Sequence, residues 1–240
     1  MDIIANVAQK VEELLNADNS GHGFEHVERV WKMAEAIYAK EGGNKDVVAL
    51  SALLHDVDDY KIFGQTSADN LTNAKKIMQE CGVEDAIQKQ VCDIVYNMGY
   101  SKLLAGIRPK TIEGKIVSDA DMLDALGING IIRTLQYAFM RCQKYGKPIF
   151  DKEAWPELNL SAEEYKKSDR RSDNCINHFF EKTLKLKDLM LTEEGRKKAI
   201  VRHNRMVMFL EGFFEENDVP EWGKFLQEFL SQSSKEKIAS

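Results

Sequence analysis

Apolar residues recur three and four positions apart along most of this chain, a spacing that places them on one side of a helix. Residues 24–41 are the clearest case, because Gly42 and Gly43 follow the last apolar position as a helix stop. We find no internal repeat and no segment with the alternating pattern of a strand. The sequence therefore predicts an all-α protein, in which residues 1–240 form a single helical bundle with a C-terminal helical extension at about 160–230.

Turn residues divide the chain into the expected helices. Ser67 is expected to cap the start of the fourth helix. Residues 146–160, which include Pro148 and Pro156, are the most irregular stretch and are expected to form a lid or flap, and the tail 231–240 is expected to fray. Helices are predicted at residues 2–16, 24–41, 46–55, 67–80, 84–97, 111–125, 131–145, 162–190, 192–216 and 222–230.

Composition excludes several kinds of partner. The net charge is −6 and basic residues are interleaved with acidic ones, so we expect no stable nucleic-acid binding, which needs clustered cations. No apolar run approaches the roughly 18 residues needed to span a membrane, and the first residues lack the basic segment of a signal peptide. The four cysteines show no paired spacing, which is typical of reduced thiols. These features together predict a cytoplasmic protein.

An adjacent imidazole and carboxylate, His55 and Asp56, end the most apolar of the predicted helices. Alone, such a pair would be read as an ordinary helix end. It is accompanied, however, by His26 near the start of the second helix and by Asp119 and Asp121 in the sixth. Nitrogen and oxygen donors of this kind suit a divalent cation, so the order His, His-Asp, Asp predicts a metal site assembled from separate helices.

At these residues the chain resembles the HD-domain metal-dependent phosphohydrolase superfamily, and most closely a bacterial and archaeal branch that includes nucleotide pyrophosphohydrolases. The resemblance covers most of the chain, from the motif at residues 26–30 to that at 178–182. It implies a helical bundle of the HD type. It also implies that a divalent ion (Mn, Mg, Fe, Ni or Co) is held by His26, His55, Asp56 and Asp121, and it leaves open whether one or two ions bind.

The resemblance favours Asp121 over Asp119 as the fourth ligand, and residues two apart on a helix cannot share a face. Asp59 stands where related enzymes carry a catalytic acid, so it is a candidate for orienting or deprotonating the attacking water, with an ordinary surface carboxylate as the alternative. His22, in a glycine-flanked loop, is a candidate acid toward the leaving group or a structural residue. Asn97 occupies a position where close relatives often carry histidine, which argues against a second tightly bound metal.

Four further residues are candidates for contacting the substrate. Lys61 is a flexible point charge suited to a phosphate oxygen, although it could equally be a solvated lysine. Arg133, His178 and Lys182 resemble pocket-lining positions of the family, and the last two lie four residues apart on one predicted helix face. Each of the three could instead be a solvated or salt-bridging side chain.

These features predict a metal-dependent phosphohydrolase that acts on a small phosphorylated metabolite, most simply a nucleotide. The alternatives are a phosphodiesterase or phosphomonoesterase of the same superfamily, or a non-catalytic module that senses a metal or nucleotide. The predicted ligand set favours an enzyme, because a sensor does not require all four donors. The pattern indicates neither the oligomeric state nor the native metal.

Overall fold

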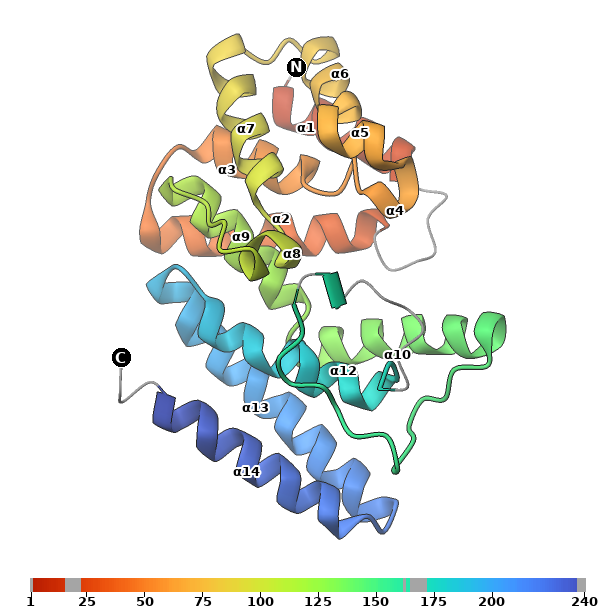
Figure 1. Cartoon of the computed structure of the whole chain (residues 1–240). Coiled ribbons are helices and arrows are strands. Elements are labelled where there is room, and N and C mark those ends of the chain that lie inside the picture. Colours follow the sequence, from red (N-terminus) through yellow and green to blue (C-terminus); the bar gives the residue numbers. More distant parts are fainter. Residues whose placement is uncertain (1, 16–22, 162, 165–171, 237–240) are drawn as a thin grey trace.

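The computed structural model describes residues 2–15, 23–161, 163–164 and 172–236, and every regular element in these ranges is helical (Figure 1). The all-α prediction is therefore confirmed. No helix among the described residues is both long and apolar enough to cross a membrane. The elements are α1 (Ile3–Leu15), α2 (Phe24–Glu41), α3 (Lys45–Leu54), α4 (Tyr60–Phe63), α5 (Gln65–Asn70), α6 (Thr72–Glu80), α7 (Asp85–Asn97), α8 (Tyr100–Leu104), α9 (Ile112–Asp124), α10 (Gly127–Tyr145), α12 (Cys175–Glu181), the 3₁₀ helix η1 (Thr183–Leu189), α13 (Glu193–Glu216) and α14 (Pro220–Glu236).

Helix α2 is central to the N-terminal half, where it packs against both α3 and α9. Every residue of α3 from Val47 to Leu54 is buried, as its apolar sequence predicts. Helices α1 and α7 cover α3 from other sides. Because α3 is enclosed by neighbouring helices, the turn that follows it is held firmly against α2 and α9.

The C-terminal helices form a second group beside α9 (Figure 1). Helix α13 packs against α2, α9, α10 and α14 and so joins the two groups. The core of the second group is aromatic: Trp222 is fully buried and lies in ring contact with Phe180 and Phe214. Large aromatic side chains bury much apolar area each, which stabilises a group built from few helices.

The predicted long helix at 162–190 is wrong in its described part. Helix α12 begins at Cys175, where the Asn174 side chain accepts a hydrogen bond from the backbone N–H of Asn177, and the chain continues after Lys182 as a 3₁₀ helix. Helix α14 is longer than predicted, since residues 231–236, expected to fray, continue it. Residues 165–171 lie outside the described part of the chain.

The predicted helix at 67–80 is divided into α5 and α6. The break is at Leu71, whose φ of 50° is left-handed, a conformation that an α-helix cannot contain. Buried Asp58 makes the break possible, because its carboxylate accepts hydrogen bonds from the backbone N–H groups of Asn73 and Ala74 at the start of α6. Ser67 caps no helix and instead donates its hydroxyl to Asp58.

Two glycines in α13 provide a matched test of the packing between α13 and α9. A Cβ atom added at Gly195 would lie 2.2 Å from the Asp119 carboxylate, whereas one at Gly212 would meet nothing within 4 Å. Gly195→Ala is therefore expected to destabilise the fold by about 1–3 kcal/mol through overpacking. Gly212→Ala is expected to stabilise it by up to about 1 kcal/mol, because alanine favours helix. Urea denaturation measures both, and equal effects would contradict this packing.

Candidate metal centre

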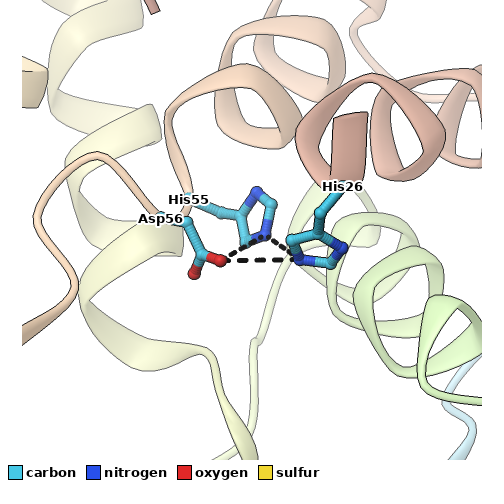
Figure 2. Close-up of side chains that lie close together, drawn as sticks. All are labelled: His26, His55 and Asp56. Carbon is cyan, nitrogen blue, oxygen red and sulfur yellow. Dashed lines mark hydrogen bonds and ion pairs between the residues drawn. The ribbon is translucent and has the colours of Figure 1, made fainter. Parts of the chain in front are cut away.

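Three parts of the N-terminal bundle contribute donors to one site. His26 lies in the first turn of α2, His55 and Asp56 lie in the turn that ends α3, and Asp121 lies on α9. Figure 2 shows the two imidazole rings and the Asp56 carboxylate pointing toward one another. The packing of α2 between α3 and α9 therefore brings together side chains that are up to 95 residues apart in sequence.

The separations between the donor atoms match those of a single metal ion. The two Nε2 atoms of His26 and His55 are 3.2 Å apart, and the Asp56 Oδ2 lies 3.5 and 3.6 Å from them. The Asp121 Oδ1 lies 3.5 and 3.9 Å from the same two nitrogens. Ligands about 2.1 Å from a metal are about 3.0 Å apart at adjacent octahedral corners and about 4.2 Å at opposite ones. All of the measured separations lie between these two values, so the four side chains fit a divalent cation.

Hydrogen bonds orient both imidazoles toward this point. The His55 Nδ1 lies 2.8 Å from the carbonyl oxygen of Ala52, and the His26 Nδ1 lies 2.7 Å from the Asp124 Oδ2. Both partners are acceptors, so each ring donates from Nδ1 and turns its Nε2 into the site. Such partners are what metal-binding histidines normally have on the side away from the metal.

Asp124 is buried and is held by two arginines as well as by His26. Arg29 donates from Nε at 2.8 Å and from Nη2 at 3.1 Å, and the Arg133 Nη1 lies 2.7 Å from the Asp124 Oδ2. Burial opposes the charge on Asp124, but hydrogen bonds from His26 and Arg29 and the charge of Arg133 outweigh it and lower the pKa of its carboxyl. The lowered pKa favours the ionised form of Asp124, whose carboxylate orients the His26 ring from its Nδ1 side.

The surrounding carboxylates also change the proton affinity of His26. Burial lowers its pKa, but hydrogen bonds to Asp121, Asp124 and Asp56 outweigh burial and raise the pKa to about 10. An imidazolium cannot bind a metal, so cation binding here must release a proton at neutral pH. Metal affinity is consequently expected to rise with pH.

The neighbouring acids Asp119 and Asp121 have different surroundings. Asp119 is fully buried and accepts hydrogen bonds from the backbone N–H groups of Leu191 and Thr192 and from the Thr192 hydroxyl. It therefore joins α9 to the start of α13, and burial raises its pKa. Asp121 points the other way, with 30% of its side chain exposed, and faces both imidazoles.

Two of the remaining candidates, Asp59 and Lys61, follow Asp56 closely in the chain. Asp59 follows Asp56 by three residues, and its half-buried position is fixed by a 3.1 Å hydrogen bond from its N–H to the carbonyl of Asp56. Lys61 is in the short helix α4, but its side chain lies outside the described part of the structure, as does all of His22. Asn97 ends α7 and donates its amide to the carbonyl oxygen of Asp93.

The predicted substrate residues that the structure describes come from α10 and from α12. Arg133 contacts Asp124, with its Nη1 also 3.0 Å from the His26 Nδ1. His178 and Lys182 lie on α12 and at its end, where the Lys182 ammonium is 5.0 Å from the centre of the Tyr100 ring. The sequence interpretation gave no role to Arg29 or Asp124. The spacing of Arg29 three residues after His26, on the same helix face, was the one available signal.

Comparisons with known proteins agree with this geometry. The HD domain family model matches residues 23–126, a range that contains all four donors and Asp124. Protein YpgQ of Bacillus subtilis is 32% identical over 213 residues, which is 88% of this chain and 90% of YpgQ.

Solved structures are similar over nearly their whole length. An HD-superfamily hydrolase from Bacillus thuringiensis is 35% identical, with a TM-score of 0.67 over 90% of this chain and 96% of that one. A Lactobacillus plantarum protein is 30% identical, with a TM-score of 0.76 over 89% and 96%. The structure of B. subtilis YpgQ in complex with ADP is 26% identical, with a TM-score of 0.62 over 87% and 97%.

An all-helical bundle with a His, His-Asp, Asp cluster and a matching family model defines the class: this chain belongs to the HD-domain superfamily of hydrolases. Within that superfamily it falls in the bacterial branch represented by YpgQ. The family resemblance noted in the sequence is thereby confirmed.

Proposed function

We propose that this protein is a metal-dependent phosphohydrolase that cleaves a phosphoanhydride bond of a nucleotide. The observation that carries the proposal is the convergence of two imidazole nitrogens and two carboxylate oxygens at separations of 3.2–3.9 Å. Two imidazole nitrogens and two carboxylates directed at one point attract positive charge, which a divalent cation supplies when it displaces the proton of His26. The YpgQ relative in complex with ADP supports a nucleotide as the ligand.

The proposed ligands are His26, His55, Asp56 and Asp121. When bound, a divalent cation at this point would lower the pKa of a water molecule and polarise a phosphoryl oxygen. Asp59 is proposed to orient that water and accept its proton, since it lies one turn beyond Asp56.

Basic side chains are proposed to hold the phosphate groups. Lys61 follows Asp59 by two residues, so the two belong to one turn beside the cluster. His178 and Lys182 are proposed to contact a more distant phosphate, and His22 to protonate the leaving group. Arg133 is given a different role, because its guanidinium donates a hydrogen bond to Asp124. We propose that Arg133 holds Asp124 against His26 and so affects the substrate only indirectly.

Product analysis by phosphorus NMR tests the proposed reaction. The protein is incubated with a nucleoside triphosphate, diphosphate or monophosphate, each with Mn²⁺, Mg²⁺ or a chelator. The metal is removed before the spectra are recorded, because Mn²⁺ broadens the signals. We expect metal-dependent cleavage of the triphosphate or diphosphate while the monophosphate persists. Release of phosphate from the monophosphate alone would identify a phosphomonoesterase, and binding without turnover of any nucleotide would favour a sensor.

Asp59→Asn separates catalysis from metal binding. The amide keeps the shape of the side chain but cannot accept a proton, so kcat is expected to fall about a hundredfold, the usual scale for general acid–base catalysis. Metal content should equal that of the unmodified protein, as measured by elemental analysis. Asp69→Asn, an exposed acid on α5, is the matched control. Equal activity of the two variants would remove Asp59 from the mechanism.

A further inference from the structure

A cavity of about 200 Å³ lies where α2, α9, α10 and α13 meet. Its lining includes Arg29, Lys32, Asp124, Asn129 and Arg202. None of the four proposed metal ligands lines it. Solvent can reach it, since 34% of the Arg29 side chain and 66% of the Lys32 side chain are exposed. The cavity is therefore separate from the metal centre and shares only Asp124 and its partners with it.

Positive charge in this cavity exceeds negative charge. Asp124 is the acid in its lining, and it already pairs with Arg29 at 2.8 Å and with Arg133 at 2.7 Å. Arg202 is half-buried, donates Nη1 to the carbonyl oxygen of Leu123 and has no carboxylate at ion-pair distance within the described residues. Among the described residues, the guanidinium of Arg202 therefore has no directly paired carboxylate.

The proton affinity of Arg202 agrees with this imbalance. Burial lowers its pKa, repulsion from Arg205 and Arg29 lowers it further, and attraction to Asp124 offsets only part of the effect. A bound anion would relieve this repulsion. The N-terminal end of α10, at Gly127 to Asn129, adds the positive end of a helix dipole from another side.

We propose that this cavity is a binding site for a small phosphate-type oxyanion. Guanidinium groups bind such anions through paired hydrogen bonds, and Arg29 and Arg202 supply guanidinium groups from two helices. Lys32, which is also paired with Glu28 at 2.6 Å, adds positive charge at the exposed side. The volume is below the roughly 300 Å³ at which pockets begin to hold drug-sized ligands, so a single phosphate group fits the site better than a whole nucleotide.

The site is coupled to the metal centre through Arg29. The Nε and Nη2 of Arg29 hold Asp124, and Asp124 holds the His26 ring. An anion that accepts hydrogen bonds from Arg29 weakens the hydrogen bonds between Arg29 and Asp124, which orient His26. The affinity for the anion and the affinity for the metal are therefore linked, and this linkage is reciprocal. Phosphate is also a product class of the proposed reaction. A role in product feedback rests on the proposed function, but binding of the anion does not.

Calorimetric titration of inorganic phosphate into the full, chelator-treated chain tests the proposal. Constant ionic strength, maintained with chloride, excludes general charge screening. We expect saturable binding at one site. Arg202→Met, which retains the aliphatic stem that packs on Gly127, is expected to weaken binding at least tenfold. Lys197→Gln on α13, whose side chain is 65% exposed outside the cavity, is the control and should bind as the unmodified protein does.

Asn129→Asp is the second variant, in case Arg202→Met fails to fold. It places a carboxylate in the lining at nearly constant shape, and an acid in the first turn of α10 favours the helix. It is expected to abolish phosphate binding while the melting temperature is kept. Absence of saturable binding, or equal binding by Asn129→Asp and Lys197→Gln, would overturn the proposal. Phosphate binding by a protein that hydrolyses no nucleotide would overturn only the proposed function.

Discussion

Replacing His55 with alanine is expected to abolish both bound metal and hydrolysis. The His55 Nε2 is 3.2 Å from that of His26 and supplies one of four donors, so its loss leaves one imidazole and two carboxylates. The ligands come from separate helices, and the cation should join α2, α3 and α9 and stabilise the fold. Elemental analysis measures the metal, and thermal melting with and without Mn²⁺ measures the stabilisation.

A matched control for this variant is His178→Ala, which removes a half-buried imidazole from α12. That variant should retain stoichiometric metal and the Mn²⁺-dependent rise in melting temperature, whatever its activity. Stoichiometric metal in His55→Ala would contradict the ligand assignment.

Asp124→Asn is expected to weaken metal binding without removing any ligand. The neutral amide no longer holds the Nδ1–H of His26 with a charge-assisted hydrogen bond, and Arg29 and Arg133 lose their shared counter-ion. Loss of such a supporting partner typically costs 10- to 100-fold in metal affinity. Competition titration against a metal chelator measures the change.

Asp173→Asn is the control for Asp124→Asn. Asp173 also accepts hydrogen bonds from an arginine, Arg141, through both of its oxygens, but it contacts no proposed metal ligand. Its replacement should leave metal affinity unchanged while removing a comparable ion pair. An equal loss of affinity in the two variants would indicate that Asp124 acts through general stability and not through His26.

The class of fold and the family could be predicted from local patterns. A spacing of three and four between apolar residues is a property of each helix by itself, so the all-α prediction needed no knowledge of packing. The nearly all-apolar segment 47–54 likewise predicted a helix buried on most sides, and residues 47–54 of α3 are buried. The order of His26, His55, Asp56 and Asp121 was sufficient to indicate a distributed metal site, because the residue types carry the chemistry.

Helix boundaries were less predictable where distant residues supply the caps. The break at Leu71 depends on the Asp58 carboxylate, 15 and 16 residues from the N–H groups that it binds. Similarly, the apolar spacing after residue 172 predicted one long helix. In the structure, α12 ends at Glu181 and the chain continues as a 3₁₀ helix. Apolar spacing alone does not record such interruptions.

Only the tertiary structure showed which acids face the imidazoles and which join one helix to another. Asp119 and Asp121 are equivalent in sequence, but the start of α13 packs over Asp119 and occupies its carboxylate, while Asp121 faces the imidazoles. Asp124 could not be recognised either, because its role depends on Arg29 and Arg133 reaching it from α2 and α10. The sequence by itself determined that the fold is helical and which kinds of donor are present. The packing of α2, α9, α10 and α13 determined which residues these side chains contact, since hydrogen bonds between distant segments form only when the segments meet in space.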